Sequence, residues 1–137
     1  WPADSPLQTH EERRVMRYMM FIKHTSDYGD IKVPPGLYED MGKFIEQYAK
    51  AGNFIGGAGL QPLAKGTQVR LKGGKITVVD GPFAESKEIV GGYAIMEFKT
   101  REEALDNARR FMELHLKHMP DFDGICEVRP FEEEVQA

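Results

Sequence analysis

Cysteine is nearly absent from this chain of 137 residues: Cys126 stands alone, so no disulfide can form within the chain. Such scarcity is typical of a reducing compartment, and we expect a cytoplasmic protein. Clustered positive charge is lacking too, because the net charge is −4 and the Lys and Arg residues are scattered. A nucleic-acid surface needs a basic patch, so we expect no nucleic-acid partner. Apolar runs stay far short of the roughly 20 residues that span a bilayer, so we expect no membrane partner.

The composition is that of a water-soluble globular protein, with 41% hydrophobic and 29% charged residues. The length suits one domain with a proper core, which we assign to residues 16–137. Residues 1–15 are mostly polar or proline and lack the charged-then-apolar pattern of a secretory signal. We expect them to form a flexible N-terminal extension.

Hydrophobic periodicity, turn residues and capping residues predict an alternation of strands and helices. Strands are expected at 17–24, 53–60, 67–71, 76–79, 92–98 and 125–131, and helices from about 35 to a stop at 51–52 and from 101 to about 118. Gly73-Gly74 predicts a tight turn between the strands at 67–71 and 76–79. Thr100 is a favourable N-cap for the second helix, and Glu103 completes a capping box.

Without the hairpin at 67–79, the order of elements is the split βαβ pattern of ferredoxin-like folds. We therefore expect an α+β fold in which two helices cover one face of a four-stranded antiparallel sheet. The first strand is apolar on both faces, with Tyr18, Met20 and Ile22 on one and Met19 and Phe21 on the other. The face away from the helices must then be covered as well, and a second copy of the chain is the simplest cover. We expect a homodimer.

The turn Asp80-Gly81-Pro82-Phe83 ends a β-branched run and precedes a charged loop and the strand that contains Gly91-Gly92-Tyr93. This stretch resembles the signature of the DGPF proteins, a branch of the YCII-related family, and the resemblance extends over about residues 17–129. It implies a dimeric α/β barrel of ferredoxin-like topology. It also implies an alternative role, because DGPF proteins resemble companions of extracytoplasmic-function sigma factors.

YCII-like enzymes resemble one another in a His at the start of the first helix that pairs with an Asp near the end of the second. Here the first helix begins Leu37-Tyr38-Glu39-Asp40, without a His, and Asp121 and Asp123 follow the second helix. The resemblance therefore does not carry this His–Asp pair over to the chain, nor the lyase or hydrolase activity that would go with it.

The candidate catalytic residues are His24, His115 and Asp80. His24 closes the first strand, where Asp27 or Asp80 could orient its ring for general-base catalysis; a merely hydrogen-bonded His is the alternative. His115 lies within the apolar stripe of the second helix, which is also where an ordinary core histidine would lie. Asp80 belongs to a motif-bearing loop, where function is common, but an Asx turn also explains an Asp there.

Four further residues are candidate ligand-binding groups. Phe83 and Lys87 would form one wall of a pocket together with Asp80. Lys23 projects to the other face of the first strand and could neutralise an anionic ligand. If the face of the strand that carries Glu97 lines the barrel, burial should raise the pKa of its carboxyl; otherwise Glu97 points to water or to the helices.

We expect no metal and no cofactor. His115 and His118 are helical neighbours, but a His pair without a nearby Cys or Glu motif is poor evidence of a metal site. The glycines of Gly56-Gly57-Ala58-Gly59 do not open a helix, as a dinucleotide fingerprint requires, because Leu60-Gln61-Pro62 follows. A bulge and close packing explain them better.

Two functions remain open. The first is binding of a small polar or anionic molecule in the barrel of a homodimer, with acid–base chemistry of the lyase or hydrolase kind. The second is a non-enzymatic regulatory or interaction module, such as a companion of an extracytoplasmic-function sigma factor. A sealed apolar interior would favour the module, whereas an open cavity that holds His24 or His115 would favour ligand binding.

Overall fold

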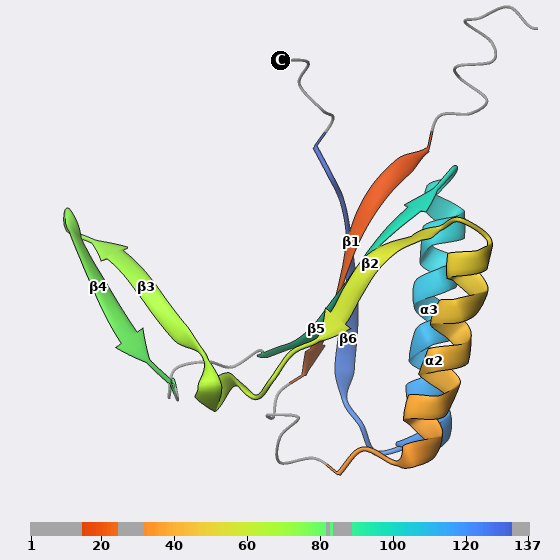
Figure 1. Cartoon of the computed structure of the whole chain (residues 1–137), viewed down its shortest axis with the longest axis horizontal. Coiled ribbons are helices and arrows are strands. Elements are labelled where there is room, and N and C mark those ends of the chain that lie inside the picture. The colour runs from red at the N-terminus through yellow and green to blue at the C-terminus, as the bar shows by residue number, and fades with distance from the viewer. Residues whose placement is uncertain (1–14, 25–31, 82, 84–88, 133–137) are drawn as a thin grey trace, which may run out of the picture.

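The main body of the protein is a sheet with helices on one face (Figure 1). The computed structural model describes residues 15–24, 32–81, 83 and 89–132. The sheet contains β1 (Met16–His24), β2 (Phe54–Gly59), β5 (Ile89–Phe98) and β6 (Gly124–Pro130), and the helices are α2 (Pro35–Lys50) and α3 (Arg101–His118). A separate hairpin consists of β3 (Thr67–Lys72) and β4 (Lys75–Asp80), and the short 3-10 helix η2 (Leu63–Lys65) precedes it.

The four strands of the sheet follow the order β2-β5-β1-β6, and each neighbouring pair is antiparallel. Chain-distant strands therefore lie side by side, with β1 in contact with both β5 and β6. The predicted α+β class, the antiparallel sheet, the helix layer and the inserted hairpin are confirmed. The pairing of two such sheets into a dimeric barrel stays a prediction.

The core lies between the helices and the sheet. Alternation along β1 buries Tyr18, Met20 and Ile22 under the helices and directs Met19 and Phe21 to the other face. The central cluster consists of Tyr18, Met20, Met96, Phe98, Ala104 and Ala108. Because α3 presents alanine to this cluster, the helix lies close to the sheet.

Both helices begin as the sequence predicts. Helix α2 starts with proline in its first turn, where the missing N–H costs nothing. At the start of α3 the hydroxyl of Thr100 accepts a hydrogen bond from the backbone N–H of Glu103 at 3.1 Å. The predicted N-cap is therefore confirmed.

The glycine-rich strand β2 packs closely against β5. A Cβ on Gly57 would lie 2.5 Å from the backbone oxygen of Tyr93, so only glycine fits there. The register shifts between Phe54 and Gly56, which confirms the bulge. The start of β5 differs from the prediction, because pairing of Ile89 with His24 extends this strand toward the chain's N-terminus.

The predicted N-terminal extension, residues 1–15, lies outside the described residues except for Val15. Neither of the helices in the described part of the chain has the length and apolar character needed to cross a bilayer.

Candidate functional site

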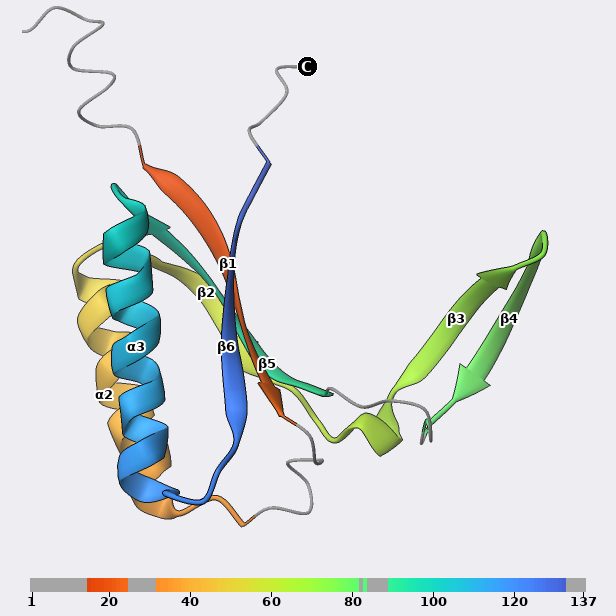
Figure 2. The same ribbon diagram turned by 180° about the vertical axis from the view of Figure 1, so that it is seen from behind.

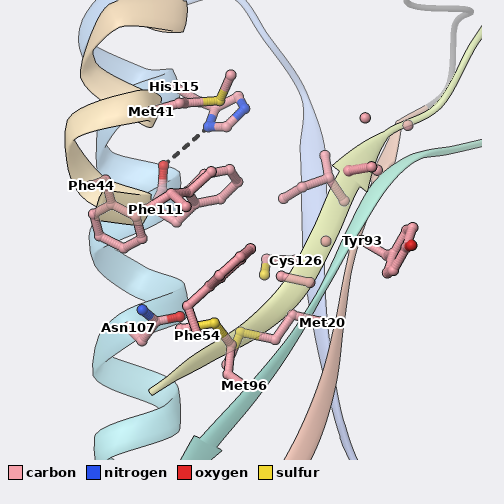
Figure 3. Close-up of a pocket in the computed structure, with 18 of the residues that line it drawn as sticks. Met20, Met41, Phe44, Phe54, Tyr93, Met96, Asn107, Phe111, His115 and Cys126 are labelled. Atoms are coloured by element: carbon pink, nitrogen blue, oxygen red, sulfur yellow. Dashed lines mark hydrogen bonds between the residues drawn. The ribbon is translucent and has the colours of Figure 1, made fainter. Parts of the chain in front are cut away.

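A cavity of about 280 Å³ lies between helix α2 and strands β2 and β5, with α3 at its side (Figure 3). The strands leave this space open because Gly57, Gly92 and Ala94 present little or no side chain to it. Apolar side chains of α2 face the strands, among them Leu37 and Phe44. The glycines that the sequence analysis assigned to packing therefore also shape a cavity.

The cavity reaches the surface of the protomer. Its exposed lining residues include Tyr38 at 61%, Ile45 at 39% and Leu60 at 48%. These three come from α2 and from the end of β2, so the opening lies between the helix and this edge of the sheet. A small molecule could enter there without unfolding the core.

Asn107 is a polar group buried in the cavity wall. Its side chain is 3% exposed, and its Nδ2 finds no hydrogen-bond partner among the residues that the structure describes. An amide donor buried without a partner costs free energy, typically about 1–3 kcal/mol. A ligand that accepts a hydrogen bond would remove this penalty.

His115 is the second buried polar group of the cavity and is 4% exposed. Its Nδ1 donates to the backbone oxygen of Phe111 at 3.0 Å, which leaves a lone pair on Nε2 of the neutral ring. The free ring nitrogen points away from α3, toward the sheet (Figure 3). Burial lowers the pKa of His115 below 6.5, although the hydrogen bond to Phe111 opposes that shift. At neutral pH the ring is therefore an uncharged hydrogen-bond acceptor.

Cys126 also lines the cavity, but as an inert group. Burial raises the pKa of its thiol to about 11, so the thiol stays protonated at neutral pH. The cavity thus has apolar walls and few polar groups, of which Asn107 and His115 lie on one helix with Phe111 between them (Figure 3).

His24 lies on the helix-facing side of β1, the same face as Ile22, and is 3% exposed. The ring of Phe122 lies near both histidines, with centroid distances of 6.5 Å to His24 and 5.4 Å to His115. His24 does not belong to the cavity lining. Asp27, one of its two suggested orienting groups, lies outside the described residues.

The motif turn lies at the base of the hairpin. Asp80 accepts a hydrogen bond from the hydroxyl of Thr67 at 2.9 Å, and Phe83 is 7% exposed. The guanidinium of Arg70 lies 5.9 Å from the centre of the Phe83 ring. Neither Asp80 nor Phe83 lines the cavity. The hydrogen bond from Thr67 to Asp80 links the two strands at the base of the hairpin. Lys87 lies outside the described residues.

Lys23 and Glu97 both lie on the sheet face away from the helices. Nζ of Lys23 is 2.8 Å from a carboxylate oxygen of Glu127, and this hydrogen bond lowers the pKa of Glu127. Glu97 accepts from the guanidinium of Arg17 at 2.7 Å. In one protomer these two candidates therefore form cross-strand ion pairs and do not meet His24, His115 or Asp80.

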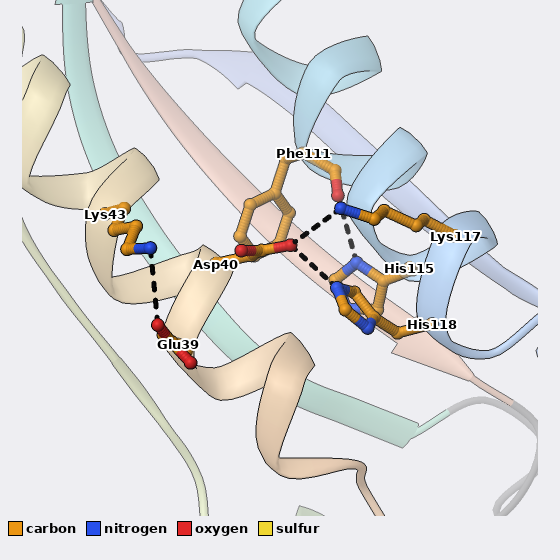
Figure 4. A network of polar contacts seen from close by, with 7 residues as sticks. All are labelled: Glu39, Asp40, Lys43, Phe111, His115, Lys117 and His118. Carbon is orange, nitrogen blue, oxygen red and sulfur yellow. Dashed lines mark hydrogen bonds and ion pairs between the residues drawn. The ribbon is translucent and has the colours of Figure 1, made fainter.

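A His–Asp pair that the sequence analysis missed joins the two helices (Figure 4). Nε2 of His118 donates to the carboxylate of Asp40 at 2.7 Å, and Nζ of Lys117 lies 3.4 Å from the same oxygen. The hydrogen bond from His118 lowers the pKa of Asp40. Relative to the YCII-like pattern the roles are exchanged, because the carboxylate is on the first helix and the imidazole on the second. Neither side chain lines the cavity, so the pair links α2 to α3.

Sequence reasoning missed Asn107 because the sequence does not show that its side chain is buried. It missed Asp40 and His118 because the sequence does not show that their two helices pack together. Across residues 15–24, 32–81, 83 and 89–132, no group of three or more His, Cys, Asp or Glu side chains could hold a metal ion.

Comparison with known proteins identifies the family. The family model of the YCII-related domain matches residues 16–113. An uncharacterised protein of Rhizobium meliloti (strain 1021) is 34% identical over 94 residues, which cover 69% of this chain and 72% of that protein. The chain belongs to the YCII-related domain family, which confirms the resemblance seen in the sequence. The Rhizobium protein is itself uncharacterised, so a ligand must be inferred from the site.

Proposed function

We propose that this YCII-related protein binds a small organic molecule in the cavity between α2 and the sheet. The observation that carries the proposal is an apolar cavity with a surface opening and a buried, unpartnered amide. An apolar cavity of about 150 Å³ holds benzene, so one of about 280 Å³ accommodates two rings or one substituted ring.

The chemical groups at the two ends of the ligand can be inferred from Asn107 and His115. Asn107 and His115 are eight residues apart on α3, or about 12 Å along the helix axis. Asn107 offers a donor, so a carbonyl, carboxylate or hydroxyl oxygen suits that end. The polar or anionic character expected from the sequence would therefore be confined to one end of a mostly apolar molecule.

The other end of the ligand would meet a base. Neutral His115 can accept a hydrogen bond, or a proton, at Nε2 while Nδ1 stays bonded to Phe111. In an acid–base reaction the proton would pass from a hydroxyl or an activated C–H of the ligand to Nε2. The lowered pKa supports this role, since it keeps the ring unprotonated before the step.

The same proposal includes a homodimer. The sheet face opposite the helices has an apolar centre that includes Phe21 and Ile95, and Tyr93 and Ile125 on it are 38% and 53% exposed. Two cross-strand ion pairs flank this centre: Lys23 with Glu127, and Arg17 with Glu97. An apolar, ion-pair-bordered sheet face can cover itself with a second copy by two-fold symmetry.

A thermal-shift screen tests the binding proposal. The panel contains one-ring and two-ring molecules that carry a hydroxyl, carbonyl or carboxylate group. A true ligand should raise the melting temperature in proportion to the logarithm of its concentration. Asn107→Ala should weaken binding of that ligand by about tenfold, which corresponds to the loss of one hydrogen bond.

The matched control is Asp106→Ala, at the neighbouring exposed position of the same helix, which should leave the affinity unchanged. If no panel member shifts the melting temperature, or if Asn107→Ala and the parent protein respond alike, the cavity is not the binding site.

A further inference from the structure

One face of the hairpin β3–β4 is apolar beyond the Thr67–Asp80 pair at its base. Val69 lies opposite Val78, and Leu71 lies opposite Ile76, so all four side chains project from the same side of the hairpin. Their exposed fractions are 70%, 69%, 74% and 70%. The intervening positions hold polar residues such as Gln68, Arg70 and Thr77. The hairpin is therefore amphipathic, but its apolar side faces solvent in the isolated protomer.

This hairpin stands away from the rest of the molecule. It projects on the side of the sheet opposite the helices, and the two views agree on that placement (Figures 1 and 2). A two-stranded hairpin alone is at best marginally stable in water. An exposed apolar strand pair is also a site of unwanted association unless something covers it. The hairpin, residues 67–80, is therefore an arm whose apolar face is uncovered in the isolated protomer.

Geometry indicates a second copy of this chain as the partner that covers this face. The hairpin lies on the same side as the apolar sheet face, where a second body would pack (Figures 1 and 2). Residues 67–80 carry Arg70, Lys72 and Lys75 against the single acid Asp80, so the hairpin bears +2, whereas the other described residues sum to zero. The contact with a second copy therefore has to come from the apolar face of the hairpin rather than from charge.

The area is sufficient for a contribution to a dimer. Four aliphatic side chains at these exposures present on the order of 500 Å² of apolar surface, and two-fold symmetry doubles it to on the order of 1,000 Å². A standard stable interface buries about 1,200–2,000 Å² in total. The arms alone therefore approach the lower limit of that range, and the sheet faces would add to the buried area.

We infer that the hairpin is a dimerisation arm, whose face of Val69, Leu71, Ile76 and Val78 packs on the second copy of the chain. This inference rests on the proposed homodimer and adds a second contact region to it. In this dimer the hairpin of each protomer packs on the other protomer, and its apolar face is buried there.

The test removes the apolar face while keeping strand-forming residues. The variant Val69→Thr, Leu71→Thr, Ile76→Thr and Val78→Thr is compared with a control that changes the polar face, Gln68→Thr and Thr77→Ser. Sedimentation equilibrium should show that the dimer dissociation constant rises at least tenfold in the first variant and stays unchanged in the control. Circular dichroism establishes that both variants keep the fold of the sheet and helices.

A second measurement uses the unaltered protein. Chains of natural isotopic composition and ¹⁵N-labelled chains are mixed, and an amine-reactive cross-linker is added. Lys72 and Lys75 at the tip of the hairpin should form cross-links between light and heavy chains. Lys72 and Lys75 are paired across the hairpin and can link to each other in any case, so only their cross-links to residues outside 67–80 count. If all of these stay within one chain after subunit exchange, the inference is overturned.

The outcomes separate the arm from the sheet pairing. A monomeric parent protein would overturn both. A four-threonine variant that dimerises as tightly as the parent protein would overturn the arm and leave the sheet pairing intact. A dimer that survives Ile95→Lys but weakens in the four-threonine variant would establish the arm and remove the sheet pairing.

Discussion

The imidazole of His115 is buried, and its Nδ1 is committed to the carbonyl of Phe111. At the scale of single residues this burial makes stability depend on pH. Burial lowers the pKa of His115 in the folded state below 6.5, so the unfolded chain holds more protons in the interval between the two values. The free energy of unfolding therefore rises with pH in that interval. The contribution is complete above pH 6.5 and is lost as the pH falls toward the lowered pKa.

We therefore expect urea denaturation to show a loss of stability between about pH 7.5 and about pH 5.5, on either side of the ordinary histidine pKa. His115→Phe preserves aromatic packing against Phe111 and Phe122 and should reduce this pH dependence. His118→Gln is the comparison: it removes the hydrogen bond to Asp40 and so lowers stability, but it should leave the part of the pH dependence that His115 causes. A pH profile for His115→Phe that matches that of the parent protein would contradict the assignment.

At the scale of elements, the cap of helix α3 gives a prediction with a magnitude. Thr100→Ala removes the acceptor for the Glu103 N–H, and that substitution class costs about 1 kcal/mol, within a range of about 0.5–2. Urea denaturation should show this loss in the free energy of unfolding. Thr100→Ser keeps a hydroxyl acceptor and should lose much less. Equal losses in the two variants would mean that the cap does not stabilise α3.

The helices, strands and turns can be predicted from the sequence more fully than the candidate site. The Gly73-Gly74 turn and the Thr100 cap are local signals, and both hairpin and helix formed where they were expected. The cavity depends on β2 lying beside β5, and no local pattern specifies that pairing. In the same way Asp40 and His118 are 78 residues apart and meet only because α2 packs against α3. Of the cavity residues, His115 was a candidate because of its chemistry, whereas Asn107 is distinguished only by its burial.

At the scale of the whole molecule, the two faces of the sheet have separate proposed roles. The cavity lies on the helix side of the sheet, and the helices and strands of one protomer form its walls. The proposed dimer contact lies on the other face, where Ile95 pairs with Met19 of β1. A charge introduced at that face should therefore affect association without changing the cavity.

We expect Ile95→Lys to raise the dimer dissociation constant at least tenfold, because a dimer would have to bury an unpaired ammonium group. A ligand found in the thermal-shift panel should still stabilise the variant to the same extent at equal concentration. Sedimentation equilibrium measures the first effect and the melting temperature measures the second. Ile125→Thr, a milder change on the same face, should weaken the dimer less. If Ile95→Lys abolished ligand binding while the fold stayed intact, the cavity would need the second protomer, and binding and association would have to be treated as one function.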